Sequence, residues 1–195
     1  MRRRTFDALL ASAGLVTALV LSAAGGLMLW AHSFVDHQVT DQLSAQQIYF
    51  PEKGSDSLND PKVKPYLEQY AGQQLTTGAQ ARAYADHYIA VHLQESGGGK
   101  TYSQLSAESR ANPEDQAKAD AVQTAFRGET LRGLLLNAYA FATMGTIAGY
   151  AAIVSFVAGG LFLLLSILGF IHRGRVGVEE EVFSLGARKP AVVEP

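Results

Sequence analysis

The sequence contains no cysteine among its 195 residues. Disulfide bonds, thiolate metal sites and cysteine nucleophiles are therefore excluded. An exported domain without disulfides fits a bacterium better than a eukaryotic secretory pathway. Charged side chains are also missing from two long stretches, residues 8–31 and 133–171. A soluble protein distributes its apolar residues periodically rather than in blocks, so this pattern favours a membrane protein.

The first uncharged stretch is long enough to cross a lipid bilayer, which takes about 20 apolar residues. Residues 9–30 contain nothing more polar than serine and threonine. This run is longer than the apolar core of a cleavable export signal, although Arg3-Arg4-Thr5-Phe6 resembles the twin-arginine export pattern. We therefore predict an uncleaved transmembrane helix over residues 9–30, after a cytoplasmic N-terminus of residues 1–8.

The second uncharged stretch is too long for one crossing and has no polar turn that would allow two. A single crossing keeps the basic residues that follow it on the same side as Arg2, Arg3 and Arg4. We predict a transmembrane helix over residues 150–171. It is preceded by an apolar juxtamembrane helix over residues 133–149 and followed by a cytoplasmic tail over residues 172–195.

The distribution of charge agrees with this topology. Residues 31–132 hold nine Lys/Arg and thirteen Asp/Glu, whereas the two tails together hold seven Lys/Arg and five Asp/Glu. Basic flanks resist translocation, so both termini are predicted inside the cell and residues 31–132 outside. Trp30 and Tyr150 then both lie at the outer membrane interface, where amphipathic aromatic side chains are favoured.

The outer segment, residues 31–132, shows helical spacing of its apolar residues and no stretch of useful length that alternates with period two. The predicted fold is therefore an all-α membrane protein, with two transmembrane helices that flank an extracytoplasmic helical bundle. The first span is predicted to continue as a helix to Phe50-Pro51, and a second helix to run from Asp60-Pro61 to Ala71, with Gly72 as its stop. A third helix is predicted from Thr76 or Thr77 to Glu95. The last helix is predicted to begin at Asn112-Pro113-Glu114-Asp115.

Two features of these helices are predicted in more detail. The helix that ends at Glu95 has an apolar face with helical spacing, and His92 lies on it, so His92 is interpreted as a hydrogen-bonded core residue. The face consists of Ala81, Ala85, Tyr88, Ile89, His92 and Leu93. The last helix runs on into the membrane, and its predicted bends are at Gly128, Gly133, Gly145 and Gly149.

Motifs for catalysis or ligand chemistry are weak. Gly99-Lys100-Thr101 lacks the glycine that a phosphate-binding loop needs at position 94, which is Gln94, and it follows a predicted helix instead of a strand. We interpret it as a flexible loop. The sequence has no nucleophile elbow and no pair of histidines four apart on a helix, so an enzyme, a cofactor and a nucleic-acid partner are not predicted.

The histidines form two pairs, His32 with His37 and His87 with His92. Residues five apart on a helix point about 140° away from each other, so neither pair chelates one ion by itself. A metal site assembled from His87 or His92 together with carboxylates from elsewhere in the fold remains open.

Small residues recur every four positions in both predicted spans, which lets helix backbones approach closely. The pattern predicts a helix contact, either between the two spans or between subunits. The predicted contact residues are Gly14, Ala18, Ser22 and Gly26 in the first helix and Gly145, Gly149, Ala151, Ser155 and Gly159 in the second. Neither span contains an ionisable residue, which argues against a pump or an ion-coupled transporter.

Several short motifs resemble a group of small membrane proteins from actinobacteria, over most of residues 5–172. The group has no established activity, so the resemblance implies a bacterial cell membrane and no particular function. The motifs are Tyr70-Ala71-Gly72, Gly78-x-Gln80-Ala81, Tyr84-Ala85, His92-Leu93, Thr101-Tyr102 and Gly128-Glu129-Thr130-Leu131-Arg132-Gly133.

Three functions are compatible with these features. The leading hypothesis is a non-enzymatic accessory subunit or scaffold of a bacterial cell-envelope complex, whose partners are the lipid bilayer and other membrane protein subunits or further copies of itself. The second is a ligand-binding sensor that signals through a separate partner. The third is a small homo-oligomeric pore lined by the faces of small residues.

The predicted topology is testable by cysteine labelling, because the chain has no cysteine of its own. The variant Ser57→Cys is expected to react with an impermeant maleimide in intact cells. The variant Ser184→Cys is expected to react only after lysis, since the charge-free runs are the segments that insert and the basic flanks stay inside. Labelling of Ser184→Cys in intact cells would reverse the assigned orientation.

Overall fold

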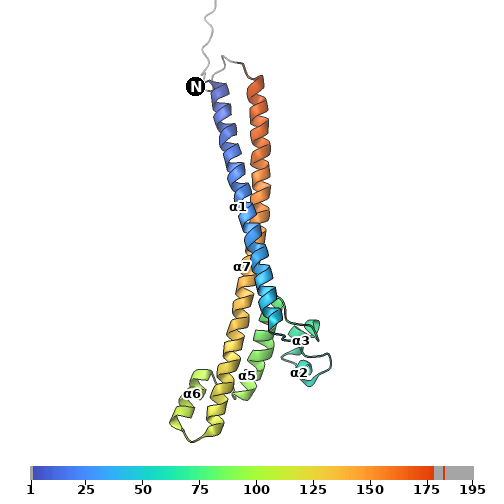
Figure 1. Ribbon diagram of the computed structural model, residues 1–195, viewed down its shortest axis with the longest axis vertical. Coiled ribbons are helices and arrows are strands. Elements are labelled where there is room, and N and C mark those ends of the chain that lie inside the picture. The colour runs from blue at the N-terminus through green and yellow to red at the C-terminus, as the bar shows by residue number, and fades with distance from the viewer. Residues whose placement is uncertain (1, 178–181, 183–195) are drawn as a thin grey trace, which may run out of the picture. The chain divides into compact units, whose positions relative to one another are not determined.

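The computed structural model describes residues 2–177 and residue 182, and this part of the chain is helical with no β-strand. The all-helical prediction is confirmed for these residues. Ser184, Arg188 and Lys189 of the predicted tail lie outside the described residues. The elements are α1 (Arg3–Ala45), α2 (Asp56–Asn59), α3 (Lys64–Leu67), η1 (Glu68–Tyr70), α4 (Gly78–Tyr84), η2 (Ala85–Ile89), α5 (Ala90–Ser96), α6 (Tyr102–Ala111) and α7 (Gln116–Arg175) (Figure 1).

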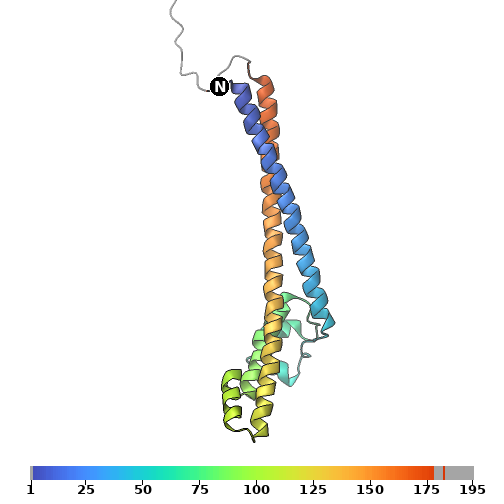
Figure 2. The same cartoon turned by 60° about the vertical axis from the view of Figure 1, so that its left-hand side comes forward.

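Two of these helices, α1 with 43 residues and α7 with 60, are long and apolar enough to cross a membrane. The chain divides into two compact units. We call Met1–Leu29 together with Gly149–Pro195 the two-helix unit, and Trp30–Ala148 the central unit. Within the two-helix unit, α1 and α7 lie side by side and run in opposite directions (Figures 1 and 2).

The core of the central unit is built by two very short helices and the connecting segments beside them. Leu58, Val63, Leu67 and Leu75 are its largest fully buried side chains. Helices of four residues are not stable alone, so α2 and α3 depend on this burial. Val39 and Leu43 of α1 and Leu135 of α7 complete the same cluster.

The first helix ends earlier than predicted. α1 stops at Ala45, and Gln47 adopts a positive φ of 52°. Gln46 and Gln47 form a turn, and the backbone groups of Ile48 and Phe50 pair with another segment instead of continuing the helix. The Phe50 amide donates to the Gln73 carbonyl over 2.9 Å, and the Leu75 amide donates to the Ile48 carbonyl over 2.8 Å.

The prediction of one helix from Asp60 to Ala71 is also wrong. Asp60 instead forms a turn, in which its Oδ1 accepts the Lys62 amide at 2.7 Å, and α3 begins only at Lys64. The predicted stop is confirmed, since Gly72 has a φ of +68° that other residues rarely adopt.

The predicted cap at Thr77 is confirmed. The Thr77 hydroxyl accepts the Gln80 amide, and the Gln80 side chain accepts the Thr77 amide, which forms a capping box at the start of α4. Ala81, Ala85 and Ile89 of the predicted apolar face are buried. The assignment of His92 to the core is wrong. His92 is exposed, and its Nδ1 lies 2.8 Å from the Tyr88 carbonyl oxygen.

The predicted helix start at Asn112 is wrong, because an unpredicted helix ends there. Thr101 and Gln104 form a second capping box that starts α6, and Asn112 is the C-terminal cap of that helix. α7 begins at Gln116, where the Asp115 carboxylate accepts the Lys118 amide at 3.2 Å. Figure 1 shows α6 beside the first turns of α7.

The glycines at which bends were predicted do not interrupt α7, which is one continuous helix from Gln116 to Arg175. At least two of them serve close packing instead. A Cβ on Gly128 would collide with the Leu93 side chain, and one on Gly145 would lie 2.9 Å from Cγ1 of Val35. Gly133 faces open space.

A pair of glycine-to-alanine variants tests this packing. A Cβ at Gly78 would collide with Cβ of Ala142 and lie 3.3 Å from Cα of Tyr139, so Gly78→Ala is expected to lower stability by roughly 1–3 kcal/mol. Gly133→Ala meets nothing and is expected to raise stability by about 0.5–1 kcal/mol. Thermal unfolding of the full chain in detergent, followed by circular dichroism, measures both. Equal melting temperatures would contradict the packing.

Candidate helix-packing and binding sites

The contact between α1 and α7 in the two-helix unit is made of small residues. Ala11, Ala18 and Gly25 are the buried positions of α1 in this unit, and Ala152, Gly159 and Ser166 are those of α7 within the helix. Both sets are spaced by seven residues, which is two turns of a helix that supercoils left-handedly around its partner. The small side chains let the two backbones approach closely.

The two sets meet in antiparallel register. A Cβ on Gly169 would lie 3.1 Å from Cβ of Ala11, and a Cβ on Gly14 would collide with the Ser166 hydroxyl. The Ser166 hydroxyl donates to the Phe162 carbonyl at 2.7 Å, so it is satisfied within its own helix. This leaves the contact without an unpaired hydroxyl there.

Further along the same contact, glycine faces the opposite backbone. A Cβ on Gly159 would lie 3.2 Å from Oγ of Ser22 and 3.3 Å from the Ala18 carbonyl oxygen. The Ser22 hydroxyl itself donates to that carbonyl at 2.8 Å. Opposite Gly25, the Phe156 ring would lie 3.1 Å from a Cβ. A larger residue at Gly159 would therefore push the two backbones apart.

The predicted packing residues are distributed unevenly over this contact. Gly14, Ala18, Ser22 and Gly159 belong to it, whereas Gly26 has nothing within 4 Å and Gly25 takes its place. Residues spaced by four along an α-helix are rotated by about 40° from one to the next around the helix axis. A stripe that starts at Gly14 has therefore rotated off the contact face by Gly26. Ala151, Ser155 and Gly149 of the predicted set are half-buried. The seven-residue spacing of Ala11, Ala18 and Gly25 was the signal that the sequence reasoning missed.

Gly145, the remaining predicted residue, lies in the central unit and is buried. Its close neighbour is Val35, and its carbonyl oxygen lies 2.9 Å from Nδ1 of His32. The helix contact at this glycine therefore carries a side-chain hydrogen bond in addition to its van der Waals packing. No pattern in the sequence indicates this role of His32.

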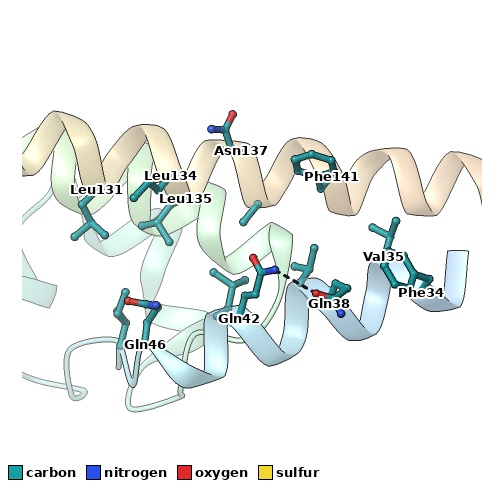
Figure 3. Close-up of a pocket in the computed structure, with 14 residues that line it drawn as sticks. Phe34, Val35, Gln38, Gln42, Gln46, Leu131, Leu134, Leu135, Asn137 and Phe141 are labelled. Atoms are coloured by element: carbon teal, nitrogen blue, oxygen red, sulfur yellow. Dashed lines mark hydrogen bonds between the residues drawn. The ribbon is translucent and has the colours of Figure 1, made fainter. Parts of the chain in front are cut away.

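The central unit also contains a groove of about 510 Å³ between its part of α1 and its part of α7 (Figure 3). In Figure 3, Leu131, Leu134 and Leu135 extend from α7 toward α1, and Gln42 extends from α1 toward α7. The Gln42 amide donates to Oε1 of Gln38 at 3.3 Å. The lining is aliphatic and aromatic apart from amides, and consists of Phe34, Val35, Gln38, Val39, Gln42, Leu43, Gln46, Ile48, Leu131, Leu134, Leu135, Asn137, Ala138 and Phe141.

A second, smaller depression of about 340 Å³ has a mixed lining of polar, aromatic and apolar residues. The rings of Tyr66 and His87 form one side, stacked with centroids 3.5 Å apart and planes 4° apart. Arg82 forms another side, where its guanidinium donates to the Tyr139 hydroxyl at 2.9 Å and lies 4.9 Å from that ring's centroid. Arg82 is thus already paired, which leaves this depression no free cation to attract an anion.

The segment η2 is a single π-helical turn that orients two side chains of this region. Asp86 lies 3.1 Å from the Arg132 guanidinium and 3.8 Å from that of Arg82. His87 of the same turn provides the stack on Tyr66. Insertion of a π turn rotates the residues that follow it, and such turns are frequent at functional sites. Here the turn joins the α4–α5 segment to α7 through an ion pair.

A row of aromatic rings runs beside this segment. Ring centroids lie 5.4 Å apart between Phe50 and Tyr84, 4.7 Å apart between Tyr84 and Tyr88, and 4.4 Å apart between Tyr88 and His92. Burial raises the pKa of the Tyr84 hydroxyl to about 12, and Tyr88 adds to the shift. Tyr84 is therefore neutral at physiological pH and acts as a packing residue.

Two residues of the segment Gly99-Lys100-Thr101, which the sequence predicts to be a flexible loop, have structural roles. Thr101 caps α6, and the Lys100 ammonium pairs with the Glu108 carboxylate at 2.7 Å. Within the described residues, no three His, Cys, Asp or Glu side chains are grouped as a metal site.

Comparisons with models of known protein families, with curated proteins and with solved structures find no significant match.

A disulfide test distinguishes a contact within one chain from a contact between subunits. Cysteines at Ala11 and Gly169 are expected to oxidise to a disulfide within one monomer, because their Cβ atoms are close and a bridge needs about 3.5–4.5 Å. Cysteines at Ala11 and Ile171, which is exposed, serve as the control that stays reduced. Non-reducing electrophoresis reads both, and a dimer band for Ala11→Cys/Gly169→Cys would assign the contact to separate subunits.

Proposed function

We propose that this chain is an integral membrane protein of the bacterial plasma membrane, which acts as a non-enzymatic accessory subunit or scaffold of a cell-envelope complex. Both termini lie in the cytoplasm, and the central unit lies outside the cell. The exposed surface of the two-helix unit supports insertion, since Leu19, Val20, Val154 and Leu165 are each more than 60% exposed. A bilayer is the environment in which such a surface is favourable.

The observation that carries the scaffold function is an uncovered apolar face on α7, within the predicted juxtamembrane segment. Phe141, Met144 and Ile147 are 58%, 63% and 62% exposed. They lie within about 120° of each other around the helix, so they form one continuous face. Exposed apolar faces of this kind are typical of protein–protein contact sites. A partner membrane subunit that packs on this face would cover it.

Two other functions were open from the sequence. A pore lined by small residues would need the α1–α7 contact to part, because Gly14, Ala18 and Gly159 are engaged in it. A ligand-binding sensor is favoured by one observation, the groove of about 510 Å³ in the central unit, whose volume is in the range of small-molecule sites. We therefore retain the sensor as the second candidate.

The proposed function is tested by purification in mild detergent. The full chain is expected to bring down a membrane protein in fixed stoichiometry, or to form a defined homo-oligomer. The double variant Met144→Gln/Ile147→Gln is expected to lose this association, because it removes the apolar face. Thr146→Gln, an exposed polar position on the same turn, is the matched control and is expected to keep it. Recovery of a lone monomer under several gentle conditions would contradict the proposal.

A further inference from the structure

The groove of the central unit shares only Phe141 with the apolar face that the scaffold function uses. We propose that it holds the hydrocarbon chain of a membrane lipid, which enters from the adjacent leaflet. The inference rests on the proposed membrane insertion, but it does not depend on any protein partner.

The lining selects an uncharged ligand. Of the 14 lining residues, ten are apolar and four carry neutral amides, so no side chain in the groove ionises. Nine of the lining residues come from residues 31–132, a segment that contains nine Lys/Arg and thirteen Asp/Glu, and the other five come from the charge-free stretch that follows. A charged ligand group placed here would lose its hydration without gaining a counter-ion, whereas a hydrocarbon chain loses nothing.

The amides provide a place for the polar part of the lipid. Gln38 and Gln42 are spaced by four on α1, and Gln46 follows directly after the last residue of that helix; all three line the groove. The described structure gives Gln46 no hydrogen bond through its side chain, and Gln38 only accepts one, from Gln42. Their free amide donors are suited to the ester and glycerol oxygens of a lipid.

The groove begins close to the end of the apolar run of α1. Phe34, one of its lining residues, is stacked on Trp30 with ring centroids 5.5 Å apart, and Trp30 closes the predicted first span. Four residues of helix cover only about 6 Å. A chain from the outer leaflet therefore reaches Phe34 with little exposure to water, and the volume of about 510 Å³ is that of a small-molecule pocket.

Fluorescence quenching by brominated lipid tests this directly, because Trp30 is the single tryptophan of the chain. In a Trp30→Phe background, a reporter is placed in the groove by Leu134→Trp, which is 61% exposed, or outside it by Ala140→Trp. Ala140 is exposed and lies six residues nearer to Tyr150, so it samples the bilayer more readily if the helix is simply immersed. Each full-length variant is reconstituted in phosphatidylcholine vesicles with brominated or ordinary acyl chains.

The Leu134→Trp reporter is expected to lose a large part of its fluorescence in brominated vesicles, whereas Ala140→Trp is expected to stay bright. Addition of Gln42→Glu places a charge in the groove and is expected to restore the fluorescence of Leu134→Trp. Gln123→Glu, an exposed position of α7 outside the groove, is the matched control and is expected to have no effect. Circular dichroism confirms that each variant is folded.

The other outcomes overturn the proposal. An unquenched Leu134→Trp means that no acyl chain occupies the groove, as when a second copy or a protein segment covers it. Equal quenching of Leu134→Trp and Ala140→Trp means that the helix is immersed in the bilayer instead of binding one lipid. The fluorescence of Trp30 in the unmodified chain distinguishes an empty groove from a failure of membrane insertion. A quenched Trp30 with an unquenched Leu134→Trp overturns the lipid site alone, whereas an unquenched Trp30 overturns insertion as well.

Discussion

Close approach of backbones at positions without a bulky side chain is the constraint on which both units depend. In the two-helix unit, Gly159 of α7 faces the backbone of α1 at Ala18. In the central unit, Gly78 of α4 faces α7 at Ala142, and Gly145 faces Val35. Dispersion falls steeply with distance, so each added Cβ would weaken many contacts at once. In the bilayer that we propose for the two-helix unit, helices have no hydrophobic drive to associate, so this close fit would matter most there.

Much of the fold could be predicted from composition and capping alone. The two long apolar helices follow from the absence of charge in residues 8–31 and 133–171. The Thr77 cap follows from the side-chain chemistry of Thr77 and Gln80. The boundaries near Ala45 and Lys64 could not be predicted, because they depend on backbone hydrogen bonds between segments far apart in sequence, such as Leu75 to Ile48. Propensity and spacing carry no information on such pairings.

The candidate sites divide in the same way. A repeat of small residues predicts a helix contact, because the repeat can be recognised within one segment of the sequence. Four of the predicted positions lie in the contact between α1 and α7. The groove could not be predicted from the sequence, because its apolar residues belong to the same periodic stripes that build a core. Leu134, which is exposed in the groove, and Leu135, which is buried, point about 100° apart on α7. Which of these two directions is covered depends on segments from elsewhere in the chain, and that is a tertiary property.

A four-residue repeat has different consequences in the two units, and the reason is local helix geometry. In α1 the repeat from Gly14 to Gly26 rotates by about 40° per step, so its last member leaves the contact. In the central unit Ala81, Ala85 and Ile89 keep the same spacing and all remain buried. The π turn Ala85–Ile89 lies in this stretch. A π turn has more residues per turn and advances fewer degrees per residue, so it cancels the drift that an α-helix would accumulate. The wider turn therefore contributes to keeping the apolar face of this segment on the core.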